Sequence, residues 1–158
     1  MKEVHISKEK YQELAEELDR LKKVERPAII KAIQEARALG DLSENAEYAT
    51  AKDKQGLIET RISELQERLQ YARLYDESKF RDDVVVVGAR VRLVDLTTEE
   101  EMSYVIVGSD DADYSANKIS DESPIGSVLI GKKIGDKVLV RAPEGSQKLQ
   151  VVGIEKGI

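Results

Sequence analysis

The feature that most constrains the fold is a pair of long apolar periodicities separated by a short polar segment. From Tyr11 onward, apolar side chains recur every three or four residues, at Leu14, Leu18, Leu21, Ile29, Ile33 and Ala36. A second run keeps the same spacing, at Ile58, Ile62, Leu65, Leu69 and Ala72. This spacing places side chains on one face of an α-helix. The two runs therefore predict two long helices that pack as an antiparallel coiled-coil hairpin.

The residues around the first run predict where its helix begins, bends and ends. Ser7 is suited to cap the helix, because its hydroxyl can accept a bond from a free backbone N–H. Pro27 lies inside the run and lacks a backbone N–H, so we expect a bend at residues 23–26. Gly40 is expected to stop the helix as a glycine just beyond its end.

The polar segment "GDLSENAEY", residues 40–48, joins the two helices and carries closely spaced carboxylates. If the second helix starts here, the spacing of three puts Asp41 and Glu44 on nearly one side. Outward carboxylates near a helix N-terminus are ionised, and ionised oxygens are the ligands that Mg²⁺ prefers. Asp41 and Glu44 also have the spacing of a capping box, in which both side chains serve the helix. The spacing leaves both interpretations open.

Two cations, Arg37 and Lys52, lie within about two helical turns of the carboxylates. Such a pair can hold an RNA or other phosphate backbone against the acids. The alternative is that both are ordinary surface ion-pair partners.

The second half of the chain changes period and predicts strands. We expect strands at 84–87, 89–94 and 103–107, a hairpin formed by 137–140 and 148–152 around "PEGS", and a short helix within "SPIGSVLIGKKIGD". The fold class is therefore α+β, with an N-terminal coiled coil at 1–76 and a C-terminal sheet domain at 77–158.

Composition excludes several kinds of function. The chain has no cysteine, and its single histidine, His5, rules out a Ser/His/Asp triad. The net charge of −6 disfavours broad DNA binding, because a duplex must be neutralised by Lys and Arg. The N-terminus is charged throughout and the longest apolar run is far too short to span a bilayer. We expect a cytoplasmic protein without a membrane partner.

Three stretches resemble the bacterial Gre family of transcript-cleavage factors, in particular its A-type. They are "RPAIIKAIQEARALGDLSENAEYATAKDKQGLIETRI", "SYVIVGSDDAD" and "ISDESPIGSVLIGKKIGDKVLVRAPEG". The resemblance implies a transcription elongation factor that is not itself an enzyme and whose C-terminal domain is FKBP-like. Its expected partners are bacterial RNA polymerase, bound at the rim of the secondary channel, and the 3′ end of the nascent RNA. We expect it to act as a monomer.

The resemblance also implies roles for particular residues. Asp41 and Glu44 would hold Mg²⁺ jointly with the polymerase, which then cuts backtracked RNA. Arg37 and Lys52 match RNA-contacting positions, although arginine is commoner at the second and Ser43 stands where many relatives carry lysine. The loop that docks on the polymerase would be formed by Glu122, Ser123, Pro124 and Ile125. This loop can equally be a turn in which Ser123 caps the next helix.

Three rival functions follow from the same architecture. A Gre-like protein that plugs the channel would inhibit the polymerase, and the intact Asp41/Glu44 pair argues against it. A coiled-coil adaptor without catalytic effect predicts that charge at the tip is irrelevant. An FKBP-like prolyl isomerase is disfavoured, because such a pocket is normally aromatic and this half offers only Phe80, Tyr104 and Tyr114.

Overall fold

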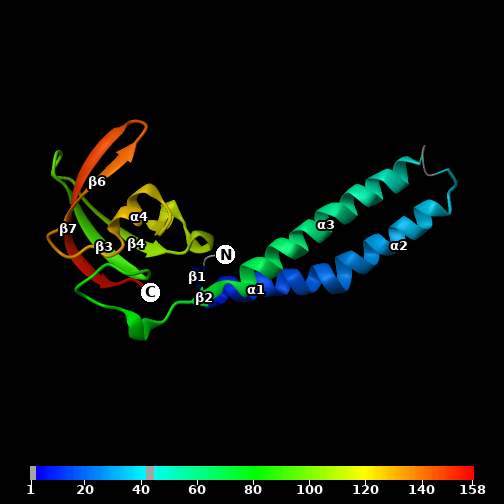
Figure 1. Cartoon of the computed structure of the whole chain (residues 1–158), viewed down its shortest axis with the longest axis horizontal. Helices are drawn as coiled ribbons and strands as arrows, with labels where there is room; N and C mark the ends of the chain where they lie inside the picture. Colours follow the sequence, from blue (N-terminus) through cyan, green and yellow to red (C-terminus); the bar gives the residue numbers. More distant parts are fainter. Residues whose placement is uncertain (1–2, 42–44) are drawn as a thin grey trace. The chain divides into compact units, whose positions relative to one another are not determined.

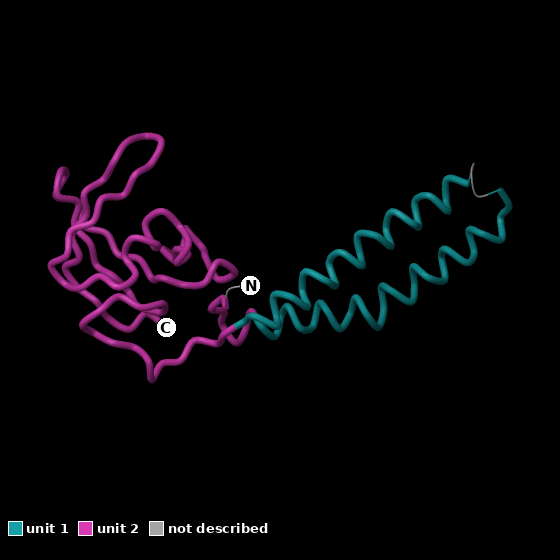
Figure 2. The backbone as a smooth tube through the Cα atoms, in the orientation of Figure 1, with its two compact units in different colours: residues 1, 11–72 teal, residues 2–10, 73–158 magenta. Residues whose placement is uncertain are grey.

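The computed structural model describes residues 3–41 and 45–158, which form two compact units. The first, the helical hairpin, comprises residues 11–72. The second, the sheet unit, comprises residues 73–158 together with the N-terminal segment up to residue 10 (Figure 2). These units do not coincide with the predicted ranges 1–76 and 77–158, because the N-terminal segment packs with the C-terminal half. The α+β class is confirmed.

The first arm of the hairpin is one nearly continuous helix with a local change of winding. Helix α1 spans Lys8–Arg20, a π-helical turn spans Leu21–Glu25, and helix α2 spans Arg26–Arg37. The backbone N–H of Arg26 donates to the carbonyl of Leu21, five residues back. Pro27 follows and lacks the N–H that would restore the α-helical ladder. The ribbon changes direction here, so the predicted bend is present as a π-bulge (Figure 1).

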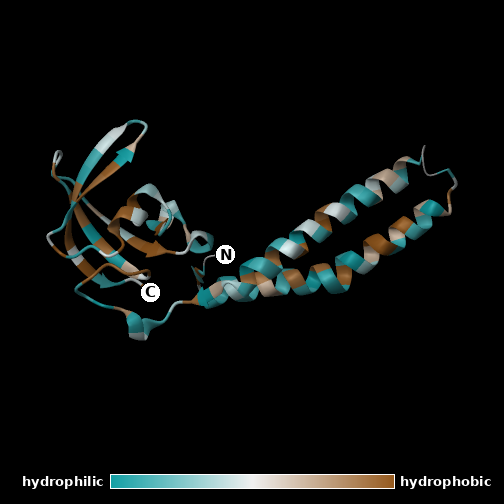
Figure 3. Cartoon of the chain, viewed as in Figure 1, coloured by the Kyte–Doolittle hydropathy of each residue, from teal (hydrophilic) through white to brown (hydrophobic). Residues whose placement is uncertain are grey.

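The second arm is the single helix α3, Ala46–Gln70, and the two arms share a narrow apolar seam. The buried cluster consists of Ile29, Ile33, Ala51, Ile58 and Ile62. Apolar segments recur along the first arm where it faces the second (Figure 3). Two cross-helix ion pairs flank the seam, Arg26 with Glu59 and Arg61 with Glu17. The predicted hairpin and its seam are confirmed.

The sheet unit contains a five-stranded sheet in the order β5-β4-β3-β7-β6. Its strands are β3 (Ala89–Asp95), β4 (Glu101–Val107), β5 (Lys118–Ser120), β6 (Lys137–Ala142) and β7 (Gly145–Lys156). Within these five strands, β4 and β5 pair in parallel, and the other neighbouring strands pair antiparallel. The β6–β7 hairpin turns at Gly145, whose φ of +134° favours glycine. The hairpin around "PEGS" was therefore predicted correctly.

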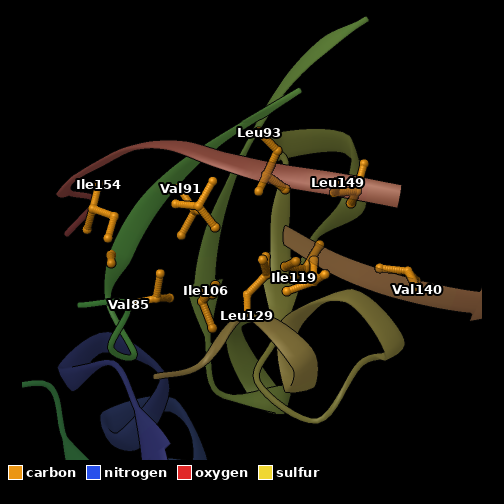
Figure 4. Packing of buried hydrophobic residues seen from close by; sticks show 12 residues of the cluster. Val85, Val91, Leu93, Ile106, Ile119, Leu129, Val140, Leu149 and Ile154 are labelled. Atoms are coloured by element: carbon orange, nitrogen blue, oxygen red, sulfur yellow. The ribbon is translucent and has the colours of Figure 1, made fainter. Parts of the chain in front are cut away.

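One helix, α4 (Pro124–Leu129), packs on the core of this sheet. The core cluster includes Val91, Leu93, Ile106, Leu129 and Leu149, whose side chains converge between sheet and helix (Figure 4). Single turns of 3₁₀ helix lie at Glu77–Lys79, Ser109–Asp111 and Tyr114–Ala116.

The predicted strand at 84–87 is wrong. This apolar run is buried at Val85 but does not join the sheet. The N–H of Val85 donates to the carbonyl of Lys132, and its own carbonyl accepts from Gly131. The run therefore fills the core through a loop-to-loop contact, which hydrophobicity alone cannot distinguish from a strand.

The N-terminal segment is fixed to the sheet unit by polar contacts that the sequence did not reveal. Strand β1 (Val4–Ile6) forms a two-stranded sheet with β2 (Ala72–Leu74). Ser7 caps α1 by accepting from the N–H of Lys10, as predicted, and its backbone N–H and hydroxyl both donate to Asp111. The Tyr75 hydroxyl donates to Asp111 and accepts from the N–H of Gly108. In the part of the chain that the structure describes, no helix has the length and apolar character needed to cross a membrane.

Candidate functional site

The first arm of the hairpin ends in a short turn that leads to the carboxylates. Helix α2 ends at Arg37, with Ala38 as its C-cap. The N–H of Leu39 donates to the carbonyl of Ala36, and the N–H of Gly40 donates to that of Arg37. Gly40 has a φ of +123°, which favours glycine. Gly40 therefore ends the turn, two residues beyond the C-cap and one residue later than predicted.

The second arm begins at Asn45, not at Asp41. The Asn45 side-chain oxygen accepts from the N–H of Tyr48 at 3.0 Å, so Asn45 is the N-cap of α3. Asp41 is therefore not the N-cap of α3, and the part of the capping-box interpretation that involves Glu44 lies outside the described residues. The assumption that places Asp41 on the first turn of that helix fails for the same reason. Asn45 followed by an acid in the first turn, Glu47, is itself a start signal that sequence reasoning missed.

Asp41 lies in the turn with its side chain exposed to solvent. Glu44 and Ser43 lie outside the described residues. The exposed carboxylate of Asp41 has the chemistry that Mg²⁺ prefers. Among residues 3–41 and 45–158, no group of three or more acidic or histidine side chains is arranged to hold a metal ion.

Arg37 and Lys52, the predicted cations, come from different helices. The Arg37 guanidinium lies 5.8 Å from the centre of the Tyr48 ring, a distance suited to a cation–π contact. Lys52 is exposed, and its amine donates to Gln55 at 3.2 Å. Because Tyr48 and Lys52 are four residues apart on α3, they share one helix face. Tyr48 thus contacts Arg37 and shares a helix face with Lys52, and sequence reasoning missed it as well.

The predicted docking loop is a rigid part of the sheet unit. The Ser123 hydroxyl caps α4 by accepting from the N–H of Gly126 at 3.0 Å and donates to the carbonyl of Ser120 at 2.6 Å. Any side chain at Gly126 would overlap that same carbonyl. The capping interpretation of Ser123 is confirmed. Pro124 and Glu122 remain exposed, whereas Ile125 packs on the core.

The sheet unit also contains a cavity of about 490 Å³ beside the N-terminal segment. Phe80 lines it, but Tyr104 and Tyr114 do not. Charged neighbours in its wall pair with each other, Arg73 with Glu3 and Lys156 with Glu77. The aromatic lining that a prolyl isomerase needs is therefore not assembled from the three residues the sequence offered.

Comparison with known proteins places the chain in one family. The family described as transcription elongation factor, N-terminal, matches residues 4–74, and that described as transcription elongation factor, GreA/GreB, C-term, matches residues 80–156. The transcription elongation factor GreA of Thermodesulfovibrio yellowstonii is 51% identical over 96% of both chains. That of Pelobacter propionicus is 49% identical over 96% of both chains.

Among solved structures, the crystal structure of the GreA factor homolog 1 (Gfh1) protein of Thermus thermophilus has a TM-score of 0.44. It is 29% identical, and the match covers 98% of this chain and 99% of that one. The two family matches span both units, and half of the aligned residues agree with GreA proteins along almost their whole length. The chain is therefore a member of the GreA/GreB family of transcription elongation factors.

Proposed function

We propose that this elongation factor binds bacterial RNA polymerase and stimulates the polymerase's own cleavage of the 3′ end of backtracked RNA. The sheet unit would dock at the rim of the secondary channel, and the hairpin would enter it. The observation that carries the proposal is the exposed carboxylate of Asp41 at the end of a long, narrow hairpin. The 25 residues of α3, at about 1.5 Å each, give a reach of about 38 Å.

The proposal treats the chain as an accessory factor and not as an enzyme. Asp41, together with Glu44, would contribute carboxylate oxygens to an Mg²⁺ ion whose remaining ligands come from the polymerase and the RNA. When bound, the ion supplies Lewis-acid polarisation and lowers the pKa of a coordinated water. The exposed position of Asp41 fits this use, because a shared ligand must be reachable from outside.

Arg37 and Lys52 would hold the RNA by its phosphates. Both side chains are exposed, and both stand on the hairpin near the turn that carries Asp41. Their charge positions the strand without reading its sequence. Tyr48 restricts Arg37 through the cation–π contact, so less side-chain freedom is lost on binding. Lys52 offers a point charge without the planar fork of an arginine.

Docking is assigned to Glu122, Ser123, Pro124 and Ile125. The Ser123 cap and the close packing at Gly126 hold the loop in one conformation, and this lowers the entropy lost on binding. Pro124 stands exposed at the first turn of α4, where it can contact a partner. We expect the chain to work as a monomer in the bacterial cytoplasm.

The test is to add the chain to a stalled, backtracked polymerase complex with labelled RNA and Mg²⁺. We expect faster removal of short 3′ fragments, loss of the effect on chelation, and no cleavage of free RNA by the chain alone. Inhibition without cleavage would assign the chain to channel plugging. Binding without any effect would leave a coiled-coil adaptor. Cleavage of free RNA by the pure chain would contradict the accessory role.

Docking is tested separately with Pro124→Ala in the full chain. The proline is exposed and precedes the helical ladder, so its loss should leave the fold intact. We expect polymerase affinity to fall about tenfold, which corresponds to about 1.4 kcal/mol, while the maximal cleavage rate is kept. Ser127→Ala, an exposed change in the same helix, is the matched control.

A further inference from the structure

Asn45 uses both ends of its side-chain amide at the junction of the two helices. Its oxygen accepts from the N–H of Tyr48 and so caps α3. Its Nδ2 donates to the carbonyl of Ala36, nine residues earlier, in the last turn of α2. One half-buried side chain therefore joins the end of one arm to the start of the other.

The carbonyl that accepts this bond belongs to a buried alanine, and the second arm buries another alanine six residues after Asn45. Ala36 is 3% exposed and Ala51 is 8% exposed, one on each arm. Small buried side chains are compatible with a close approach of the two arms, and the bond from Asn45 to Ala36 joins the arms directly. The carbonyl of Ala36 also accepts from the N–H of Leu39, so one acceptor connects Asn45 to the backbone that leads to Asp41.

Asn45 also orders the contact that holds the Arg37 side chain. By holding the N–H of Tyr48, Asn45 fixes the first turn of α3, and the Tyr48 ring lies against Arg37. Loss of the bond to Ala36 would therefore affect the end of α2, which leads to Asp41, and loss of the cap would affect Tyr48 and with it Arg37.

We propose that Asn45 is a positioning residue for stimulated RNA cleavage, acting through its bond to the Ala36 carbonyl and not only as a helix cap. The inference rests on the proposed function of the tip. Holding the end of α2 against the start of α3 would order the backbone that leads to Asp41 before the hairpin meets the polymerase. Small misplacements of reacting groups carry large rate penalties.

Three substitutions of Asn45 distinguish its bond to Ala36, the bridge, from its bond to Tyr48, the cap. Asn45→Asp and Asn45→Ser both keep a capping oxygen, since Asp, Ser and Asn are comparable N-caps. Both lose the Nδ2 donor to Ala36: an ionised aspartate has no donor, and the serine hydroxyl, one bond shorter than the amide nitrogen, reaches less far and adds no charge to the tip. Asn45→Ala loses cap and bridge together. If Asn45 acts only as a helix cap, only the alanine variant should lose stimulated RNA cleavage. If the bond to Ala36 matters, all three variants should lose it to a similar extent.

The first readout is cleavage in backtracked complexes over a range of factor concentration. For all three variants we expect the maximal rate to fall about tenfold or more, with the half-maximal concentration within about twofold of the parent. Thermal unfolding should be nearly unchanged for the aspartate and serine variants. If these two cleave within about twofold of the parent, Asn45 is only a cap and the proposal is overturned.

The second readout does not depend on the polymerase. The chain contains no cysteine, so Gln34→Cys and Ala49→Cys, exposed sites on the two arms, can be spin-labelled without competing thiols. We expect one narrow distance distribution in the parent and a broader one in the serine variant. An unchanged distribution would overturn the bridge even if cleavage falls. If the parent itself stimulates no cleavage, the proposed function fails, and the distance measurement still decides whether the bridge orders the tip.

Discussion

The hairpin and the sheet unit bury their apolar side chains in different ways. In the sheet unit, 12 residues form one cluster enclosed by strands and helix, and Leu93 and Ile106 are fully buried. In the hairpin, only five residues form the buried cluster, arranged as a single seam between two arms. Val24 and Leu57, on opposite arms, remain more than half exposed at 55% and 73%.

This difference in packing fits the two proposed roles, in which the hairpin assists catalysis and the sheet unit docks on the polymerase. Asp41 and Arg37 lie near the end of the hairpin and outside its buried seam, so both are exposed to a partner. In the sheet unit, the loop at Ser123 is part of the fold, because the same hydroxyl caps α4. Asp41 and Arg37 therefore lie outside the buried cluster of the hairpin, whereas the proposed docking loop is part of the fold of the sheet unit.

The largest expected contrast concerns core truncation. Leu93→Ala should destabilise the sheet unit by about 4 kcal/mol, because the enclosed site cannot collapse onto the cavity. Ile62→Ala in the seam should cost about 2 kcal/mol, since two helices can approach each other to fill the space. Hydrogen exchange of amides in β3 and in α3 measures both losses. Equal costs would remove the proposed difference in packing.

The next effect concerns the N-terminal segment. A methyl group at Gly108 would overlap the backbone carbonyl of His5, although the φ of −70° at Gly108 suits any residue. Gly108→Ala should therefore cost about 2–3 kcal/mol and release β1 from the sheet unit, measured by unfolding and by exchange at Val4–Ile6. Gly135→Ala is the control, because its site is open and only its positive φ is strained. If both variants lose the same stability, the steric account of Gly108 is wrong.

Much of the fold could be predicted because it rests on local or periodic signals. The spacing from Leu14 to Ala72, the cap at Ser7 and the glycine turn of the β6–β7 hairpin each report a physical constraint within a few residues. The prediction of a strand at 84–87 was wrong because an apolar run has the same sequence pattern in a buried loop as in a paired strand. The packing of the N-terminal segment was missed because it depends on Asp111 and Tyr75, which are far away in sequence.

The candidate site was predictable in part. The tip residues came from residue types and from family resemblance, and their roles stay predictions. Asn45 and Tyr48 were missed because their contacts with Ala36 and Arg37 cross between the arms. Such contacts depend on how the arms are aligned against each other, which periodicity alone does not fix.

At alkaline pH the sheet unit should lose stability through the ionisation of Tyr75. Burial raises the pKa of Tyr75 above its ordinary value of 10.0, so the folded state favours the neutral phenol. This stability is complete below pH 10 and is lost as the pH rises through the folded pKa, by on the order of 1 kcal/mol at pH 11. Exchange in the sheet unit measures the loss. Tyr75→Phe should lower the stability at neutral pH but abolish the dependence of stability on pH above pH 10. If that pH dependence is unchanged in the variant, another group causes it.

The smallest expected effect lies in the hairpin and has the opposite sign. Gly56 lies within α3. Among residues 3–41 and 45–158, no heavy atom lies close to the position that a Cβ atom would take there. Gly56→Ala should stabilise the hairpin by about 0.5–1 kcal/mol, because alanine loses less backbone entropy in a helix. Thermal unfolding followed by circular dichroism at a helix-sensitive wavelength measures the gain. A loss of stability would mean that this face of α3 is covered.

The most direct measurement is the maximal rate of stimulated RNA cleavage with Asp41→Asn and Glu44→Gln at saturating factor and Mg²⁺. Both changes keep size and remove charge, and Asn45 already caps α3, so polymerase affinity and unfolding should stay close to those of the parent. We expect each variant to lose at least about 100-fold in rate, about 2.7 kcal/mol of transition-state stabilisation. If both variants bind the polymerase and cleave within about threefold of the parent, the tip carboxylates do not assist catalysis.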